Sequence, residues 1–371
     1  MTQDSRCDVV VVGGGPAGSA TAIALTERGL STTVVVGDAC RSGTDRIGES
    51  VPPEIEPLLA RLALGDEFRR DGHLPAAATA SSWGTSELAW RDGFTSATGA
   101  GWHLSRGRFD EMLLREAARR RGRVLRGGRV VALTRLGDEG WSVTLRARDG
   151  GVGELNAPFM VDATGRAAVV ARRLGAVRVV DDDLVCVYGA LEAAGASAYP
   201  DTVVESVEDG WWYAARLPDG RWMTALFTDR AVLRLRGAAG RDGWYRLLAS
   251  TAHVFPLLGQ PAAPAKVHLV SARSQRLGNV AGKGWLAVGD AAMAWDPLTS
   301  AGIVQALRSG LRASEAVAGI LRGDERAGPS YQAEHVALHA RYLAERRAYY
   351  AIEHRWPHSP FWQRRAERRG V

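Results

Sequence analysis

A glycine-rich turn that joins a short apolar strand to a helix constrains this chain more than any other feature of its sequence. The strand is the β-branched run Asp8–Val12, and the turn that follows is Gly13-Gly14-Gly15-Pro16-Ala17-Gly18. Gly13, Gly15 and Gly18 match the pattern GxGxxG. In that pattern the first glycine permits a tight turn, the second lets the backbone approach a pyrophosphate, and the third lets helix and strand pack closely.

The residues after the turn complete a β-α-β unit. Small and apolar residues at helical spacing predict a helix from Ser19 to Arg28, and Thr32–Val36 predicts a second buried strand. The backbone N–H groups at the start of this helix, which opens with Pro16 and Ala17, would then face the phosphates of a bound dinucleotide. A carboxylate that binds the ribose is expected where the second strand ends, and Asp38 is the nearest one.

Composition narrows the protein class. With 371 residues, 24% of them charged, the chain suits one large or two intertwined globular domains. Cys7, Cys40 and Cys186 are too widely spaced for a disulfide framework or a metal site. No apolar stretch could cross a bilayer, so we expect a cytoplasmic protein without a membrane partner. The net charge of +6 comes mainly from arginine, and the richest arginine stretch is 341–369. This stretch is either a solvated helix face or a docking surface. The sequence shows no nucleic-acid-binding module.

Two later segments have the same pattern, a predicted strand that is followed by glycine or aspartate. Phe159–Asp162 leads into Ala163-Thr164-Gly165, and Trp285–Val288 leads into Gly289-Asp290. Ligands of parallel sheets lie outside the carboxyl ends of the strands, so one extended cofactor would explain all three strand ends. A second glycine-rich pattern is absent, which favours FAD as the tightly held nucleotide over a separate NAD(P) domain.

The remaining patterns predict an α/β protein: a Rossmann-like FAD-binding domain, an inserted antiparallel β substrate domain, and C-terminal helices. We assign residues 1–80, 100–178 and 270–330 to the first, 81–99 and 179–269 to the second, and 331–371 to a C-terminal helical segment. The elements expected are a helix starting at Ser50-Val51-Pro52-Pro53, an amphipathic helix over Gly107–Arg121, a hairpin of Arg129–Leu136 with Trp141–Arg148, and helices over Gly302–Arg322 and Ser330–Arg347.

Motifs across the chain resemble those of FAD-dependent aromatic hydroxylases and halogenases of the para-hydroxybenzoate hydroxylase fold. Beside the first turn they are Gly48-Glu49-Ser50, Arg106-x-x-Phe109-Asp110, Asp162-x-Thr164-Gly165, and Gly289-Asp290-Ala291-Ala292 followed by Asp296-Pro297-Leu298-Thr299-Ser300-Ala301-Gly302-Ile303. The resemblance implies that Arg106 contacts the FAD phosphates and Asp290 the ribose or pyrophosphate. It also implies that Pro297–Ile303 passes along the isoalloxazine ring, where a helix N-terminus stabilises negative charge. Asp290 as a helix cap and Pro297 as a plain turn residue are the alternatives.

The turn, the strand ends and the resemblance together define one set of expected FAD contacts. These residues are Gly13, Gly15, Pro16, Ala17, Gly18, Asp38, Glu49, Ser50, Arg106, Asp162, Gly165, Gly289, Asp290, Pro297, Ser300, Gly302 and Ile303.

The presence or absence of one lysine distinguishes halogenases from hydroxylases among the resembling proteins. The resembling halogenases use a lysine about thirty residues after the Gly-Glu motif, whereas the corresponding stretch here, 77–84, has none. The chain's two lysines, Lys266 and Lys283, lie far away in sequence, and Lys283 occupies an exposed Gly-Lys-Gly turn. Hydroxylation through a flavin 4a-hydroperoxide is therefore expected, with molecular oxygen as co-substrate and NAD(P)H or a flavin reductase as electron source.

A narrower resemblance concerns the substrate. Trp83-Gly84, Gly101-Trp102-His103-Leu104-Ser105-Arg106, Trp211–Pro218 and Arg355-Trp356-Pro357 are similar to segments of the flavoproteins that accompany quinone-cofactor amino-acid oxidases. Those flavoproteins oxygenate a tryptophan side chain within a partner protein. The resemblance thus implies an indole or tryptophyl substrate, either in a polypeptide or as a small molecule.

Candidates for the reaction itself adjoin these motifs. His103 and Glu49 could act as the base that deprotonates the ring, or could be a buried histidine and a salt-bridged glutamate. Six aromatic residues either line a substrate cleft or fill the core, and five of them are the expected substrate contacts: Trp83, Trp102, Trp211, Tyr213 and Trp222, with Trp212 as the sixth. The rival functions are a reductase or desaturase of the geranylgeranyl-reductase type, and a flavin-bearing escort that docks through Arg355–Arg369.

Overall fold

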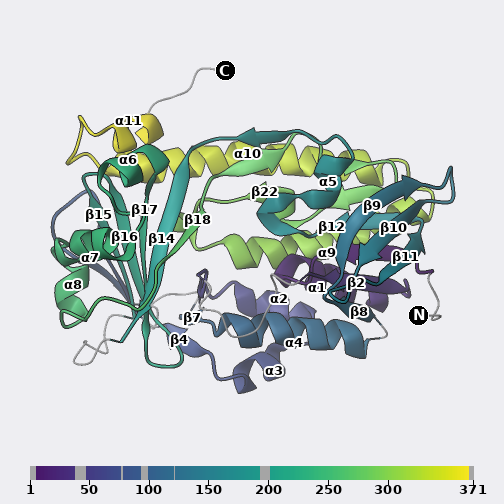
Figure 1. Cartoon of the computed structure of the whole chain (residues 1–371), viewed down its shortest axis with the longest axis horizontal. Helices are drawn as coiled ribbons and strands as arrows, with labels where there is room; N and C mark the ends of the chain where they lie inside the picture. The colour runs from purple at the N-terminus through teal and green to yellow at the C-terminus, as the bar shows by residue number, and fades with distance from the viewer. Residues whose placement is uncertain are drawn as a thin grey trace.

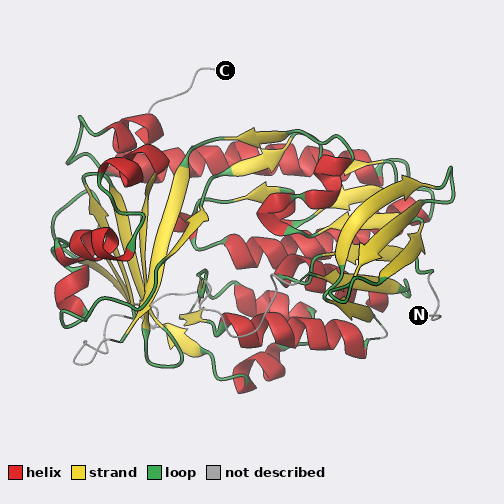
Figure 2. Ribbon diagram, viewed as in Figure 1, coloured by secondary structure: helices red, strands yellow, loops and turns green. Residues whose placement is uncertain are grey.

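The chain folds into two halves, each built on its own β-sheet (Figure 1 and Figure 2). The computed structural model describes residues 6–37, 47–76, 78–92, 99–120, 122–192 and 201–366. Asp38 and Cys40, which the sequence singled out, lie outside the described residues.

A parallel sheet forms the first half. Its strand order is β20-β21-β12-β1-β2-β8, and every neighbouring pair is parallel except β20 with β21. The strands are β20 (Ala281–Gly282), β21 (Trp285–Ala287), β12 (Phe159–Asp162), β1 (Val9–Val12), β2 (Thr32–Val36) and β8 (Arg123–Arg126). All four valines of β1 are buried, which is the pattern of a strand covered on both faces.

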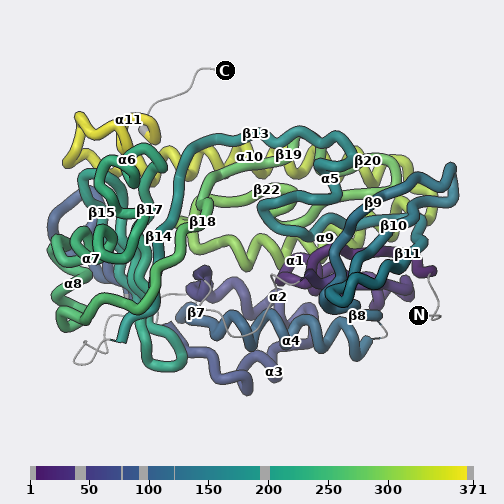
Figure 3. The backbone as a smooth tube through the Cα atoms, in the orientation of Figure 1, coloured from purple at the N-terminus to yellow at the C-terminus, as the bar shows by residue number. Residues whose placement is uncertain are grey.

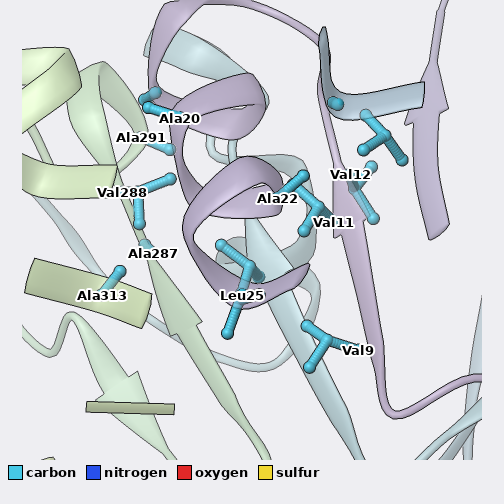
Figure 4. Packing of buried hydrophobic residues seen from close by; sticks show 14 of the residues in the cluster. Val9, Val11, Val12, Ala20, Ala22, Leu25, Ala287, Val288, Ala291 and Ala313 are labelled. Atoms are coloured by element: carbon cyan, nitrogen blue, oxygen red, sulfur yellow. The ribbon is translucent and has the colours of Figure 1, made fainter. Parts of the chain in front are cut away.

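Helices cover this sheet and leave its carboxyl end open. Helix α1 (Pro16–Glu27) packs between α9 (Gly302–Leu321) and α4 (Arg106–Arg119). Figure 4 shows Ala20 of α1 beside Ala291, and Ala22 beside Val11 on the other side of the helix. The small side chains of α1 let α9 approach closely, because a Cβ at Gly310 would lie 2.7 Å from the carbonyl oxygen of Ala17.

A seven-stranded sheet forms the second half, in the order β18-β14-β17-β16-β15-β5-β6. Its strands are β18 (His268–Ser271), β14 (Leu184–Leu191), β17 (Trp222–Asp229), β16 (Gly210–Arg216), β15 (Thr202–Val207), β5 (Ala78–Ser82) and β6 (Ala89–Asp92). All pairs are antiparallel except β15 with β5, which is parallel. One face packs under α6 (Arg230–Leu235), α7 (Arg241–Ala249) and α8 (Val254–Leu257); the other faces the parallel-sheet half. Strands β5 and β18 cross the boundaries expected at residues 80 and 270.

Three small sheets and the remaining helices complete the described fold. The sheets are β11-β10-β9 (Val152–Ala157, Trp141–Arg146, Arg129–Arg135), β13-β19-β22 (Arg178–Val180, Gln275–Leu277, Met293–Ala294) and β3-β7-β4 (Ser50–Val51, Gly101–His103, Leu74–Ala76). The helices are α2 (Ile55–Arg61), α3 (Gly65–Arg70), α5 (Val169–Arg173), α10 (Ala327–Ile352) and α11 (Pro360–Ala366), with 3-10 turns at Gly165–Ala167, Gly289–Ala291 and Pro297–Thr299. No helix in the described ranges is long and apolar enough to cross a bilayer.

The long helix α10 runs along one side of both halves, and α11 packs beside the seven-stranded sheet (Figure 3). The sequence predicted α10 only over Ser330–Arg347, but it extends from Ala327 to Ile352. The hairpin of β9 and β10 and the helices α4 and α9 are confirmed to within a residue or two.

One predicted helix start is wrong. Ser50 and Val51 form strand β3, paired with His103 and Trp102, and α2 begins only at Ile55. A residue that precedes proline is driven toward extended backbone, so Val51 before Pro52 favours the strand.

Candidate active site

A cavity of about 960 Å³ lies between the carboxyl ends of the parallel strands and the open face of the seven-stranded sheet. All three strand ends that the sequence singled out contribute to its wall. The cavity-lining residues that the sequence predicted are Gly13, Gly15, Pro16, Ala17, Ser50, Arg106, Gly165, Asp290, Pro297, Ser300, Gly302, Ile303, Trp211 and Tyr213. The structure therefore brings together residues up to 290 positions apart in the chain.

The first glycine turn forms one end of the cavity. Gly13 has φ of +118°, and a Cβ on it would lie 2.1 Å from the carbonyl oxygen of Ala163. A Cβ on Gly18 would lie 2.0 Å from the carbonyl oxygen of Gly13, so this glycine serves packing and does not line the cavity. A Cβ on Gly15 would meet nothing within 4 Å.

Open glycines recur at the second strand end and at the start of α9. Gly165 and Gly302 also have nothing within 4 Å of an added Cβ, and both line the cavity together with Gly15. Three backbone segments thus present bare glycines to one space, with the N-termini of α1 and α9 beside them. This cradle fits the phosphates and ring system of a dinucleotide such as FAD.

Asp162 organises the second strand end from inside the protein. Its carboxylate accepts hydrogen bonds from the amide of Thr164 (2.9 Å), the Thr164 hydroxyl (2.6 Å) and the amide of Ala171 (2.8 Å). The side chain is fully buried, and this burial raises its pKa. Asp162 does not line the cavity; its carboxylate instead fixes the turn that presents Gly165 and the start of α5.

Arg166, which the sequence analysis missed, connects the second and third strand ends. Its Nε lies 3.4 Å from Oδ2 of Asp290, and its other nitrogens donate to the carbonyl oxygens of Trp295 (3.2 Å) and Arg273. Both Arg166 and Asp290 line the cavity. Its position directly after the Asp162–Gly165 motif was the available signal. Gly289, the residue before Asp290, is buried under Ala17 and does not line the cavity.

Arg106 stands at the N-terminus of α4 and reaches the loop before β3. One terminal nitrogen donates to the carbonyl oxygens of Ile47 (3.1 Å) and Gly48 (3.2 Å), and the other pairs with Asp110 at 3.2 Å. Its Nε is buried and has no partner among the described residues. A positive side chain with an unused donor at the cavity wall fits an anionic group of a cofactor.

The loop that leads into α9 is fixed by its own aspartate. Asp296 accepts a hydrogen bond from the amide of Leu298 (3.0 Å), which caps the turn Pro297–Thr299. Ser300 then adopts a left-handed conformation with φ of +48°. An unfavourable backbone conformation of this kind persists only where the surrounding contacts hold it.

Asp296 is itself held by side chains of α10. Asp296 Oδ2 lies 3.1 Å from Nε of Arg346 and accepts a hydrogen bond from the Tyr350 hydroxyl at 3.0 Å. The amide of Asp296 donates to the Tyr342 hydroxyl at 2.8 Å, and Arg346 also pairs with Asp182 at 2.7 Å. Asp296 and its three partners on α10 are buried, so this helix holds the loop from the side away from the cavity.

An aromatic wall closes the other side of the cavity. Trp211 and Phe227 stack with ring centroids 3.9 Å apart, and Tyr188, Tyr213 and Cys186 line the same face. The indole nitrogen of Trp211 donates to the Tyr350 hydroxyl at 3.2 Å. Tyr350 therefore links this wall directly to Asp296 on the loop before α9.

Glu49 and Tyr213 form a buried pair at the cavity. Tyr213 lines the cavity, and its hydroxyl donates to Oε1 of Glu49 at 2.6 Å. Glu49 itself is buried behind Tyr213, and its Oε2 has no partner within the described part of the chain. Burial raises the pKa of Glu49, against the hydrogen bond from Tyr213, and burial together with the Glu49 charge raises the pKa of Tyr213 well above its usual range.

His103 lies outside the cavity. It is fully buried in β7, with Nε2 2.8 Å from the Thr202 hydroxyl and Nδ1 unpartnered among the described residues. Burial lowers its pKa to about 4, so the ring is neutral at pH 7. Because it does not line the cavity, the structure does not place His103 where a base could reach a substrate there.

Three of the five expected substrate aromatics also lie elsewhere. Trp222 packs on the opposite face of its sheet, under the helices, as does Trp212. Trp102 packs edge-on against Phe68 and donates to Glu56 at 3.1 Å. Trp83 sits behind Trp211 and donates to the carbonyl oxygen of Tyr349 at 3.0 Å.

Three described arginines of the C-terminal region form ion pairs within the molecule. Arg355 pairs with Glu353 at 2.8 Å, and Arg364 and Arg365 pair with Asp229 at 2.5 and 2.6 Å. Hydrogen bonds from Arg355 and Ser206 outweigh burial and lower the pKa of Glu353 to about 2. These pairs bind the tail to the seven-stranded sheet. Arg368 and Arg369, the last arginines of the docking stretch considered from the sequence, lie outside the described residues.

Comparison with known proteins identifies the family. A family model described as FAD binding domain matches residues 6–242. The FAD-dependent oxidoreductase LodB of Marinomonas mediterranea is 30% identical over 362 residues, 96% of each chain.

Solved structures agree with this. The peptidyl tryptophan dihydroxylase QhpG, essential for tryptophylquinone cofactor biogenesis, is 32% identical with a TM-score of 0.80, over 99% of this chain and 80% of QhpG. The flavin-dependent halogenase CmlS is 25% identical with a TM-score of 0.86, over 98% of this chain and 68% of CmlS. The chain belongs to the FAD-binding family that these proteins share, and it is an FAD-dependent oxidoreductase.

Proposed function

We propose that this protein is an FAD-dependent monooxygenase that inserts oxygen into the indole ring of a tryptophan residue in a polypeptide. In each turnover one ring C–H bond becomes C–OH. One O₂ molecule supplies that oxygen, and its second atom leaves as water. NAD(P)H or a flavin reductase supplies the two electrons required. The observation that carries the proposal is the aromatic wall of Trp211, Phe227 and Tyr213 facing the glycine cradle across one cavity.

The cofactor contacts in this proposal follow the cavity wall. The turn at Gly15, the N-terminus of α1 and Arg106 would hold the phosphates, while Gly165 and Asp290 would flank the pyrophosphate and ribose. The loop Pro297–Ile303 would lie along the ring system. When bound and reduced, FAD supplies the reaction with O₂ and the transfer of one oxygen atom.

The chain's own residues position the ring and move its proton. Stacking against the aromatic wall would orient the indole and exclude water. The Tyr213 hydroxyl donates to Glu49, so its oxygen is left to accept a hydrogen bond from the indole N–H. As Tyr213 takes that proton it passes its own to Glu49, whose raised pKa makes it a suitable acceptor.

The choice of oxygenation over halogenation is supported by the position of the two lysines. Lys283 is 77% exposed and pairs with Asp138 at 2.9 Å, and Lys266 is exposed. Neither lines the cavity, so no amine of this chain faces the space where the substrate would lie. The choice of a polypeptide substrate is supported by the 32% identity to QhpG, whose substrate is a peptidyl tryptophan.

Aromatic lining also separates this proposal from a reductase or desaturase of long isoprenoid chains. Such an enzyme needs an aliphatic tunnel, whereas Trp211, Tyr213, Phe227 and Tyr188 line this cavity with aromatic rings. A flavin-bearing escort would not need Tyr213 and Glu49 paired at the cavity wall.

The test is the mass of substrates after turnover. The FAD-loaded protein is incubated with NADH, NADPH or a flavin reductase under ¹⁸O₂, with the tryptophan-containing polypeptides encoded beside its gene, free tryptophan and chloride or bromide. We expect heavy oxygen on a polypeptide tryptophan. Labelling of free tryptophan alone would move the protein to small-molecule hydroxylation. A halogenated product, or a mass change without ¹⁸O, would refute the proposal.

A further inference from the structure

The seven-stranded sheet ends at the cavity with an edge strand. Among the described strands, β18 pairs only with β14, in the register Cys186 opposite Val270 and Val187 opposite Leu269. Val270 and Ser271 line the cavity, together with Ala272 just after the strand. Figure 1 shows β18 on the side of the sheet that faces the parallel-sheet half. The edge of this sheet therefore forms part of the cavity rim.

Half of the backbone groups of β18 point away from β14. The amide of Ala272 donates to the carbonyl oxygen of Leu184 at 3.0 Å, so these two residues form a hydrogen-bonded pair. Bonded pairs alternate in an antiparallel ladder, so Val270 bonds to β14 while Leu269 and Ser271 direct their N–H and C=O groups outward. Within the described ranges, no backbone or side-chain group bonds to these outward groups.

The side chains of β18 do not block pairing. Proteins protect free sheet edges with charged residues, prolines or bulges, and β18 carries none of these. Instead Leu269 is 49% and Val270 38% exposed. The strand at the other end of the sheet, β6, carries the charged residue Arg91.

We propose that β18 is the docking edge for the polypeptide substrate, which binds as an added antiparallel strand. The residue of that strand opposite Val270 would lie on the same sheet face as Val270, Cys186 and Phe227, which line the cavity. That residue is the tryptophan to be oxygenated. The inference rests on the proposed function, because it takes the substrate to be a polypeptide.

The geometry predicts which peptide amides matter. The residues on either side of the tryptophan lie opposite Leu269 and Ser271 and exchange hydrogen bonds with them. The amide of the tryptophan itself points outward, because Val270 bonds to β14. N-methylation of both flanking residues should therefore weaken binding at least tenfold, and N-methylation of the tryptophan should leave it within about threefold.

The probe is an acetylated and amidated seven-residue peptide with a central tryptophan between alternating threonine and valine. Its dissociation constant from the oxidised, FAD-loaded protein is measured by calorimetry, beside its two methylated forms. The variant Leu269→Lys, which charges the edge, should weaken binding at least tenfold. Leu235→Lys, at an 84% exposed position on α6, is the matched control and should not.

The binding results decide the docking edge independently of turnover. Equal binding of all three peptides, equal binding by Leu269→Lys and Leu235→Lys, or no saturable binding of the unmethylated peptide would each overturn the proposal. The unmethylated peptide is also incubated under turnover conditions and weighed. Edge-dependent binding without oxygen insertion would count against the proposed function and leave the docking edge standing.

Discussion

Tyr213 is the side chain that joins the cavity to a buried carboxylate, so its hydroxyl can be tested by itself. In Tyr213→Phe the ring still lines the cavity, but the 2.6 Å hydrogen bond to Glu49 is lost. We expect unchanged FAD content and a loss of about a hundredfold in the rate of oxygen insertion, within the range for removal of an acid–base group. The measurement is single-turnover product formation across pH.

Two comparisons separate proton transfer from packing. Tyr245→Phe removes a similar bond, 2.8 Å to the carbonyl oxygen of Pro261, far from the cavity lining, and should leave the rate unchanged. Glu49→Gln keeps an acceptor for Tyr213 but removes the basic carboxylate, and should lower the rate as Tyr213→Phe does. Full activity in Glu49→Gln would show that the pair serves only to hold Tyr213 in place.

His103 should affect stability and not chemistry. Burial lowers its pKa to about 4, against about 6.5 for an unfolded chain, although Asp201 acts in the opposite direction. Between these values the unfolded state binds more protons, so stability falls as pH drops from about 6.5 toward 4. The contribution is about 3 kcal/mol by the linkage relation.

The measurement is the unfolding free energy from urea titrations at pH 7 and pH 5. In His103→Gln the loss of stability between these pH values should be smaller than in the unmodified protein. His354→Gln, at an exposed position, should retain the full loss. An unchanged pH dependence in His103→Gln would mean that other groups cause it.

At the scale of elements, the turn between β1 and α1 contains glycines with two different roles, one at the cavity and one in packing. A Cβ on Gly15 enters open space at the cavity, whereas a Cβ on Gly18 would clash with the carbonyl oxygen of Gly13 at 2.0 Å. We expect Gly15→Val to fold with an unchanged melting temperature in the cofactor-free state but to bind FAD at least tenfold more weakly. Gly18→Val should fail to fold or melt far earlier. Calorimetry and flavin absorbance provide both measurements.

Elements whose signals are local were predictable. The valines of β1, the glycines after it and the two later strand ends each carry their own pattern, and their convergence follows from the rule for parallel sheets. Strand β3 was not predictable, because it is two residues long and exists through pairing with His103 and Trp102 of a distant segment. Even the alternation along β16 could not show whether Trp211 or Trp212 faces the cavity, since the covering elements decide this.

At the scale of the molecule, the support of the loop before α9 comes from the far end of the chain. Asp296 contacts Tyr342, Arg346 and Tyr350, which lie 46 to 54 residues later on α10. The sequence predicted a helix there, but no local pattern indicates which of its polar residues turn inward. Burying an arginine and an aspartate is costly unless they pair, which explains why Arg346 meets both Asp296 and Asp182.

Tyr350 offers a test of whether this support matters to the reaction. Tyr350→Phe removes the bond to Asp296 and leaves the buried indole nitrogen of Trp211 without its partner. The loss should lower stability by about 1–3 kcal/mol. Because the loop and the aromatic wall then lose their common link, we also expect more of the consumed O₂ to be released as hydrogen peroxide instead of entering the substrate.

Tyr331→Phe distinguishes this effect from general destabilisation. Tyr331 is buried on the same helix and donates to the carbonyl oxygen of Ala287 at 2.8 Å, with no contact to Asp296 or to the aromatic wall. It should lose comparable stability while its ratio of hydrogen peroxide to product stays that of the unmodified protein. If both variants release more hydrogen peroxide to the same extent, α10 acts through overall stability. If only Tyr350→Phe does so, Tyr350 is a positioning residue that fixes the loop before α9 relative to the aromatic wall.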